Sequence, residues 1–186
     1  MGPCEREGVF VPLWSAGDYL HPLPRLISGA KDHHRWDVVG ILAGRLACAI
    51  AGLVDAVGTC GPGVIVPFPS RAAVVRERGL DLTHALATKA TRHLRAVGLP
   101  VRVEAILTHA RQVQDQGGLT TTQRRSNIEG CLVGRPGRGN RWVVLVDDVV
   151  TTGASLREGV RALSASGEAP MGLATIAATV LRGGSG

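Results

Sequence analysis

The chain has few aromatic residues and almost no lysine. Aromatic residues make up 3% of its 186 residues, which argues against a stacking platform for single-stranded nucleic acid, because such proteins stack successive bases on aromatic side chains. Only Lys31 and Lys89 are lysines, so arginine carries most of the formal net charge of +6. Guanidinium groups suit bidentate phosphate recognition, but a genome rich in G and C would also replace lysine by arginine. Charge alone therefore decides nothing about function.

The cysteines are too widely spaced to form a metal or disulfide motif. Cys4, Cys48, Cys60 and Cys131 include no C-x-x-C pair, so the sequence indicates neither a zinc ribbon nor a disulfide framework. The histidines also lack the spacing of metal ligands. We therefore expect reduced thiols, a cytoplasmic protein and no zinc.

Several other functional signatures are missing. The sequence has no G-x-x-x-x-G-K loop, no G-x-G-x-x-G turn after a strand and no nucleophile elbow around Ser155, which argues against Walker-type, dinucleotide-binding and hydrolase sites. The start lacks the pattern of a signal peptide. The apolar run 38–57 is interrupted by Arg45 and Asp55 and repeats at helical spacing. We predict a buried amphipathic helix there and no membrane association.

The strongest functional signal is the stretch 143–155, VVLVDDVVTTGAS. Its apolar start predicts a strand buried on both faces of a parallel sheet and ended by Asp147 and Asp148. The small, hydroxyl-rich turn that follows leads into a helical pattern, and a helix N-terminus of this kind can bind an anion. Carboxylates cannot hold the same anion, so we expect them to face hydroxyl groups or a divalent cation. A ligand with a phosphate and a vicinal diol is a sugar phosphate.

The other apolar segments have the length and alternation of an α/β domain. Helices are predicted over 25–30, 36–57, 79–97 and 156–163, and strands over 64–66, 101–107, 128–133, 143–146 and 171–180. Glycine and proline before residue 25 predict an irregular lead-in. The polar stretch 111–127 has no core face, which is typical of a functional loop. We predict one domain with a mostly parallel sheet flanked by helices.

The stretch 143–155 resembles the 5-phosphoribosyl-1-pyrophosphate (PRPP) motif of type I phosphoribosyltransferases, and the flanking chain resembles the ComF family within them. The resemblance implies that the two acids hold the ribose hydroxyls, directly or through Mg bound chiefly by ligand oxygens. It also implies that the following turn holds the 5-phosphate. The PRPP-binding residues would be Asp147, Asp148, Thr151, Thr152, Gly153, Ala154 and Ser155.

Two further segments resemble the same family. A V-P-x-P run and an R-G pair lie near pyrophosphate in the family, although the usual asparagine and glutamine after them are Asp81 and Leu82 here. The pyrophosphate-side residues would be Pro67, Pro69, Ser70, Arg71, Arg76, Arg78 and Gly79. Arg76 and Arg78 could instead form a solvated helix start. The polar stretch resembles the flexible catalytic loop, and its catalytic residues would be Arg111, Gln116, Arg124 and Asn127.

The N-terminal region departs most from the family. Lys31 occupies the place of a family lysine, but a solvated polar turn explains it as well. The family usually begins with a cysteine-rich zinc-binding segment, of which only Cys4 is present here. The helical hood over the nucleophile would then be short. We expect lead-in and hood over 1–60, a phosphoribosyltransferase-like core over 61–182 and a loose tail over 183–186.

The function we predict is Mg-dependent phosphoribosyl transfer from PRPP, or at least binding of PRPP or another ribose 5-phosphate compound. Two alternatives stay open: a non-catalytic PRPP sensor or scaffold, and an accessory protein that binds DNA through phosphates. ComF relatives are associated with DNA uptake, which implies a helicase-like partner. A homodimer is a further expectation. The sequence does not indicate the attacking nucleophile.

Overall fold

The computed structural model describes residues 11–110, 130–137 and 139–179. The elements in chain order are β1 (Leu13–Ser15), α1 (Leu23–Asp32), the short 3-10 helix η1 (Trp36–Val38), α2 (Val39–Val57), β2 (Gly63–Pro67), α3 (Ala72–Arg78), α4 (Leu82–Ala96), β3 (Val101–Val103), β4 (Leu107–His109), β5 (Leu132–Gly134), β6 (Trp142–Val150), α6 (Ala154–Ala165) and β7 (Gly172–Ala178). The main sheet has five parallel strands in the order β1-β7-β6-β2-β3, and β4 pairs with β5 in a separate antiparallel sheet. The predicted α/β fold with a mostly parallel sheet is confirmed.

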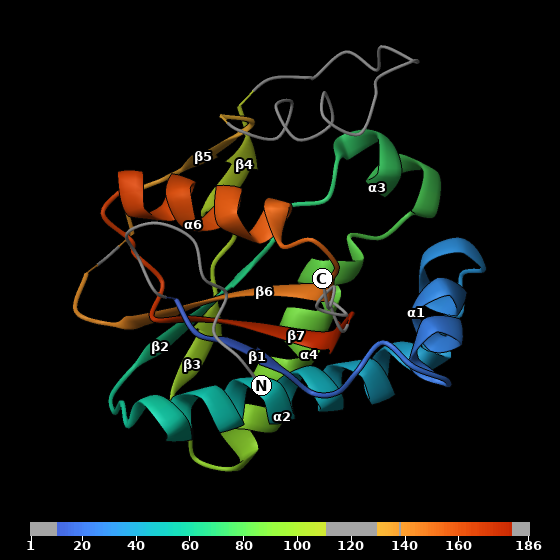
Figure 1. Cartoon of the computed structure of the whole chain (residues 1–186), viewed down its shortest axis with the longest axis horizontal. Helices are drawn as coiled ribbons and strands as arrows, with labels where there is room; N and C mark the ends of the chain where they lie inside the picture. The colour runs from blue at the N-terminus through green and yellow to red at the C-terminus, as the bar shows by residue number, and fades with distance from the viewer. Residues whose placement is uncertain (1–10, 111–129, 138, 180–186) are drawn as a thin grey trace, which may run out of the picture.

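Helices cover both faces of the parallel sheet (Figure 1). α2 and α4 lie on one face, while α6 lies on the other and packs against the β4–β5 hairpin. Side chains of β6 alternate between two apolar clusters. Val144 and Val146 join the cluster with α2 and α4, whereas Val143 and Leu145 join the cluster with α6. Every apolar residue at the start of β6 is therefore buried, as a strand covered on both faces requires.

The long apolar segment Trp36–Val57 forms a core helix of this protein. By length and composition alone it could cross a membrane, but 56% of its most apolar window is buried inside the protein. Leu42, Leu46, Ile50 and Leu53 are completely buried in the cluster that also contains residues of β6, β7 and α4. Of the two helices expected to form a hood, α2 thus packs on the sheet, and α1 stands beside one edge of it (Figure 1).

The N-terminal lead-in contains a strand that the sequence did not reveal. β1 pairs in parallel with β7, with Leu13 opposite Leu173. Its three residues lie between Pro12 and Gly17. A run this short has no readable alternation of apolar and polar residues, so its strand conformation depends on the neighbouring strand.

Two predicted elements are divided in the structure. The predicted strand 101–107 becomes β3, which joins the main sheet, and β4, which begins at Leu107 and joins the small sheet. The predicted helix from Gly79 is wrong at its start, because Gly79 has a φ of 70° and ends α3. Asp81 then caps α4 by accepting the backbone N–H of His84. Only glycine adopts such a φ at little cost, which is why the chain turns there.

Some predictions fall outside the described residues. They concern the residues 1–10 with Cys4, the polar loop 111–127, the start of a predicted strand at 128–129, and the tail from residue 180.

Gly63 begins β2 against the indole ring of Trp142. A Cβ atom at Gly63 would overlap ring atoms Cη2 and Cζ2 of Trp142, and the indole N–H donates to the Gly61 carbonyl over 3.0 Å. We expect Gly63→Ala to lower the free energy of unfolding by about 1–3 kcal/mol through overpacking. Gly44→Ala in α2, where nothing lies within 4 Å of the added Cβ, should raise it by about 0.4–1 kcal/mol. Denaturant unfolding measures both changes, and equal effects would contradict the packing argument.

Candidate functional site

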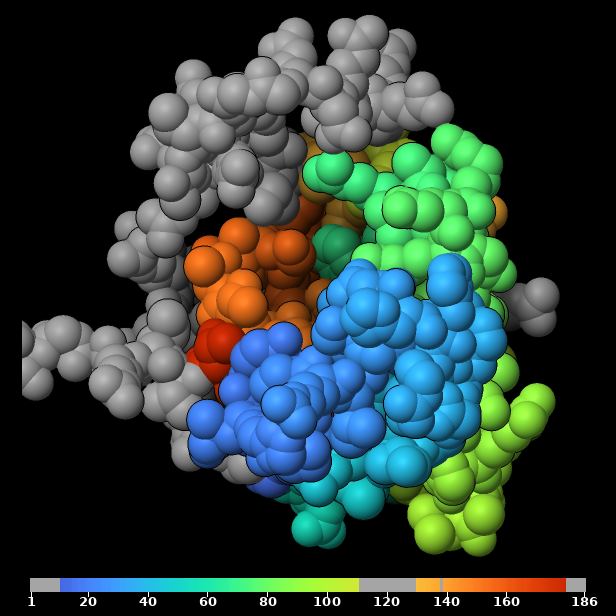
Figure 2. All heavy atoms as spheres, turned by 90° about the vertical axis from the view of Figure 1, so that its right-hand side faces the viewer, coloured from blue at the N-terminus to red at the C-terminus, as the bar shows by residue number. Residues whose placement is uncertain are grey.

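The carboxyl ends of β2 and β6 meet at one edge of the main sheet. Pro67, the last residue of β2, lies opposite Val146 of β6. Open α/β sheets bind ligands at this edge. α1, α3 and the N-terminus of α6 surround it (Figure 1), and Figure 2 faces it and shows a hollow between these three segments. The two segments that the sequence predicted to bind the two ends of a ligand therefore lie at the same edge.

The acidic pair, Asp147 and Asp148, lies within β6. Val149 and Val150 still pair with β7, so the prediction that the acids end the strand is wrong, because β7 continues beside them. Each carboxylate is held by the next backbone N–H: Asp147 Oδ1 accepts from Asp148 and Asp148 Oδ1 accepts from Val149, both over 2.8 Å. Asp148 is 5% exposed. Both acids are thus fixed in orientation at the edge of the sheet.

The C-terminal end of α1 contacts both halves of the site. The ammonium group of Lys31 forms an ion pair with Asp148, and Lys31 is 32% exposed. The next residue, Asp32, accepts a hydrogen bond from Arg78 of α3 over 3.3 Å. The structure therefore places Lys31 in the site and not in a solvated turn. The sequence left both interpretations of Lys31 open, because no local pattern indicates an ion-pair partner that lies more than 100 residues away in the chain.

The environment of the acidic pair makes one of its carboxyls hard to ionise. Burial, and after it the negative charge of Asp148, raises the pKa of Asp147 to about 8. The backbone N–H of Asp148 and the Lys31 ammonium lower that pKa but do not outweigh the first two causes. Because two adjacent carboxylates repel, a second positive charge in the site would favour ionisation of both. The pair is suited to a divalent cation or to hydroxyl donors.

The phosphate turn, residues 151–155, connects β6 to α6. Thr151 and Thr152 are exposed, and Gly153, Ala154 and Ser155 are half-buried. Gly153 has a φ of 72° and precedes the first residue of α6. The N–H groups of a first helical turn have no acceptor within the helix, so an anion at this position can accept several hydrogen bonds. The structure brings all seven predicted PRPP-binding residues together in one strand, turn and helix.

The loop after β2 is held from two sides. The carbonyl oxygen of Pro69 lies 3.1 Å from Nε2 of His109. Because a carbonyl oxygen only accepts, Nε2 carries the hydrogen in this bond. The hydroxyl of Ser70 donates to Asp81 over 2.9 Å. Asp81 departs from the family pattern, and its carboxylate here links this loop to the N-terminus of α4. These contacts order the loop at this edge of the sheet.

α3 was not predicted, and it changes the interpretation of the arginines. Arg71 is the N-cap residue of α3, whereas Arg76 and Arg78 lie in its last turn. The interpretation of Arg76 and Arg78 as a helix start is therefore wrong. Arg71 and Arg76 are exposed, and Arg78 is half-buried against Asp32. With Pro67, Pro69, Ser70 and Gly79 they form the pyrophosphate-side segment, residues 67–79.

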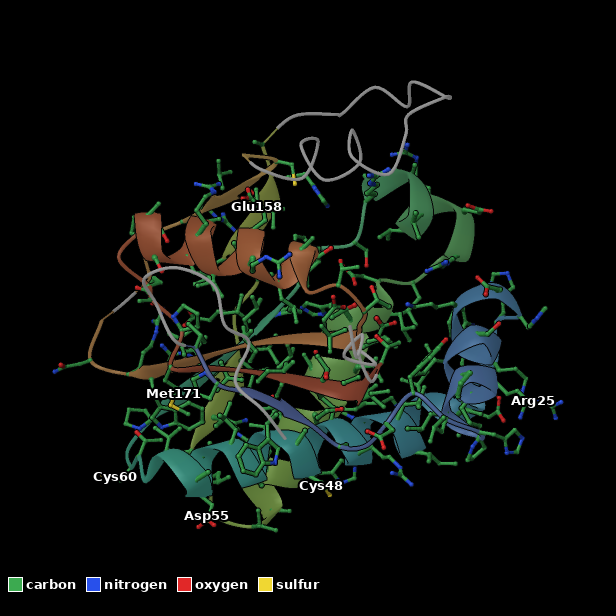
Figure 3. The ribbon with its side chains drawn as sticks, viewed as in Figure 1. Arg25, Cys48, Asp55, Cys60, Glu158 and Met171 are labelled. Atoms are coloured by element: carbon green, nitrogen blue, oxygen red, sulfur yellow. The ribbon has the colours of Figure 1, made fainter. Side chains whose placement is uncertain are left out.

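The four predicted catalytic residues, Arg111, Gln116, Arg124 and Asn127, lie outside the described residues. The strands on either side, β4 and β5, are described. Glu158 of α6, labelled in Figure 3, accepts the N–H of Leu132 in β5 over 3.0 Å. Arg161 donates to the Leu132 carbonyl over 2.9 Å and to Glu158 over 2.7 Å. Two side chains of α6 thus bind the edge of β5 as a neighbouring strand would.

Glu158 and Arg161 together form a clamp on Leu132 of β5. This clamp was not predicted from the sequence. Burial raises the pKa of Glu158, but the hydrogen bond from Arg161 and backbone N–H groups outweigh it, so the pKa is lowered overall and the carboxylate stays ionised. The signal available in the sequence was a glutamate and an arginine three residues apart on α6. The structure shows in addition that the glutamate is only 3% exposed. A buried acid on a helix needs a partner, and here the pair connects α6 to the hairpin.

With this geometry established, the chain can be compared with known proteins. No protein-family model matches it. It is 28% identical over 145 residues, 76% of its length, to Competence protein F of Haemophilus influenzae. It is 32% identical over 82 residues, 41% of its length, to orotate phosphoribosyltransferases of two Xylella fastidiosa strains. The chain spans 62% of the competence protein and 36% of each transferase.

Both similarities support a phosphoribosyltransferase-like protein. The parallel sheet with helices on both faces is consistent with the type I fold of such proteins. Both similarities are distant and cover only part of each chain, and they support the overall resemblance to this family and the fold.

The carboxylates of this candidate site fit a magnesium ion that also binds ligand oxygens better than a metal ion held by protein side chains alone. Among the described residues, no group of three or more histidines, cysteines, aspartates or glutamates could hold a metal ion. Asp147 and Asp148 are consecutive residues of β6 and offer carboxylate oxygens at this edge. Magnesium commonly binds through one or two carboxylates together with waters and substrate phosphates. The acidic pair would supply the protein's share of such a site.

Replacing Lys31 tests the ion pair. Without the ammonium, Asp148 is a buried carboxylate beside Asp147, so we expect Lys31→Met to lower the free energy of unfolding by about 1–3 kcal/mol. Combined with Asp148→Asn, the loss should be smaller than the sum of the single changes. Lys89→Met, on an exposed position of α4, is the matched control. Strictly additive changes in a denaturant double-mutant cycle would contradict the pair.

The raised pKa of Asp147 predicts a pH dependence of stability. Between about pH 4 and pH 8 the folded protein keeps a proton that the unfolded chain has lost, so the contribution of Asp147 to stability falls as pH rises through this window. Asp147→Asn cannot ionise and removes this dependence. We expect wild type, compared with the variant, to be relatively more stable at about pH 5 than at about pH 8. Unfolding free energies measured at both pH values check this, and a constant difference would show that the pKa is not raised.

Proposed function

We propose that the protein binds PRPP with Mg²⁺ and transfers the 5-phosphoribosyl group with release of pyrophosphate. The observation that carries the proposal is the continuity of the acidic pair and the phosphate turn at the edge where β2 also ends. A diol next to a phosphate matches these two features, and the pyrophosphate-side segment lies at the same edge. The distant similarity to Competence protein F and orotate phosphoribosyltransferase supports the proposal.

In the ribose half, the protein's role is positioning. Asp147 and Asp148 would accept hydrogen bonds from the ribose 2- and 3-hydroxyls or share a magnesium ion with them. The backbone N–H groups and hydroxyls of residues 151–155 would hold the 5-phosphate. A ligand fixed at both ends exposes its anomeric carbon in one orientation. Bound magnesium would supply positive charge that neutralises the phosphate oxygens.

In the pyrophosphate half, the protein's role is electrostatic. The bond from the anomeric carbon to pyrophosphate breaks, a bond to the nucleophile forms, and negative charge grows on the leaving group. Arg71, Arg76 and Arg78 would stabilise that charge. Lys31 and Arg78 are paired with carboxylates in the structure, so a ligand phosphate would compete with Asp148 and Asp32 for them. The residues Arg111, Gln116, Arg124 and Asn127 would complete this half.

A thermal shift experiment tests the proposal. PRPP with Mg²⁺ should raise the melting temperature, since a ligand at 100 times its Kd stabilises the folded state by about 2.7 kcal/mol. Asp147→Asn combined with Asp148→Asn should abolish the shift. Asp55→Asn is the matched control, because Asp55 is an exposed carboxylate near the C-terminal end of α2, far from α1 (Figure 3). No shift in the parent protein would overturn the site assignment.

A PRPP-binding sensor or scaffold without catalysis is the second candidate. It is favoured by one observation: Asp81, which stands where the family has asparagine, is engaged with Ser70 and with the N-terminus of α4. Release of pyrophosphate from PRPP in the presence of candidate acceptors would separate a transferase from a sensor. A cytoplasmic role in DNA uptake with a helicase-like partner rests on the resemblance to Competence protein F. If the protein binds DNA through its phosphates, that binding should weaken as the salt concentration rises.

A further inference from the structure

A second pocket lies on the outer side of α1. Its volume is about 570 Å³, which falls in the range of small-molecule sites. Its lining includes the side chains of Tyr19, Pro24, Arg25, Ser28, His33 and Arg35. Arg25 points away from the sheet (Figure 3), so this outer pocket is separate from the acidic pair on β6.

The outer pocket is lined by positively charged and hydroxyl groups. No carboxylate lines it among the residues that the structure describes. Arg25 is exposed and has no ion-pair partner in the described part of the chain. Arg35 is held by Asp37, which accepts from its Nε over 2.8 Å and from its Nη2 over 2.6 Å. One guanidinium is thus unpaired and the other is fixed in place, a combination that favours an anion with several oxygens.

One continuous stretch of the chain, residues 19–35, builds this pocket from the residue after β1, helix α1 and the turn that follows the helix. Tyr19 follows β1, and its N–H donates to the carbonyl of Ala178 at the end of β7 over 2.8 Å. After α1 the chain folds back over the helix, because the Gly29 carbonyl accepts from the N–H groups of His33 and Arg35 over 3.2 and 3.0 Å. The Arg35 stem then lies against Gly29, where an added Cβ would be 3.6 Å from it. The pocket is therefore a product of the fold and not of one helix end.

We propose that the outer pocket is a second ligand site for a small phosphorylated metabolite of the mononucleotide type. Arg25, Arg35 and His33 would bind the phosphate, whereas the hydroxyl of Ser28 donates to Asp32 over 3.1 Å. Tyr19 packs on the core and offers a fixed aromatic surface for a planar ring, with Pro24 beside it. Arg25, His33 and Arg35 line the same pocket, so they suit a single phosphate and not the run of phosphates of a nucleic acid.

Occupancy of the outer pocket would influence the first site. Arg25 lies in the first turn of α1, whereas His33 and Arg35 follow its last turn. That last turn carries Lys31 and Asp32 with their ion pairs to Asp148 and Arg78. A ligand that ties these segments together would stabilise the end of α1. This consequence rests on the proposed PRPP site, whereas binding in the outer pocket does not.

Calorimetric titration of the full chain at low salt with AMP, GMP, CMP, UMP and inorganic phosphate tests the proposal. At least one mononucleotide should bind more tightly than inorganic phosphate. Arg25→Gln and Arg35→Gln should each weaken that binding about tenfold, the loss expected for one charge-assisted hydrogen bond. Arg92→Gln on an exposed position of α4 is the matched control and should change nothing. The double variant Asp147→Asn, Asp148→Asn should keep mononucleotide binding, so failure of the PRPP site and failure of the outer pocket are distinguishable.

Four outcomes of the mononucleotide and phosphate titrations would overturn the proposal. They are the absence of mononucleotide binding, equal affinity for inorganic phosphate, unchanged binding in both arginine variants, and loss of binding in the Asp147 and Asp148 double variant alone, which would place the nucleotide in the first site. Steeply salt-dependent binding of an oligodeoxynucleotide without mononucleotide binding would also overturn it, because it would make this surface a nucleic-acid interface. Because Arg25 and Arg35 are exposed, both variants should fold, and their melting temperatures check this.

Discussion

The parallel pairing of β6 with β2 and β7 is the constraint on which the rest of the structure depends. β6 contributes side chains to both apolar clusters, so the helices on the two faces pack on the same strand. The register places the end of β2 opposite Val146, directly before the acidic pair. Because parallel strands end at the same edge, residues 67–79 and 147–155 share one site.

A buried acid, Asp148, next to the half-buried Asp147 places two like charges close together, and the surrounding elements reduce that repulsion. Lys31 balances Asp148, while the pKa of Asp147 is raised by burial and by its neighbour. Both partners of the α1 end, Asp148 and Arg78, belong to segments with a proposed ligand role. α1 is therefore connected to the site by charge and to the core by its apolar face, where Leu23, Ile27 and Ala30 are buried. A helix attached in this way can respond to ligands on either side of it.

Charged side chains stabilise two segments near the candidate site. Asp81 caps α4 and binds Ser70, so its carboxylate stabilises the loop that follows β2. The β4–β5 hairpin lies outside the main sheet and is attached to α6 by Glu158 and Arg161. In both places a charged side chain satisfies backbone groups that no neighbouring strand or helical turn can reach.

The sequence by itself determined the strand, acids, turn and helix around residues 143–155, because burial on two faces, paired acids and small hydroxyl residues are local and periodic signals. It also predicted the parallel α/β class and the core helix 36–57. Only the tertiary structure decided the partner of Lys31, the edge strand β1, the helix boundary at Gly79 and the clamp at Glu158. Each of these depends on a contact with a segment distant in the chain, or on a backbone angle, and neither leaves a repeat in the sequence.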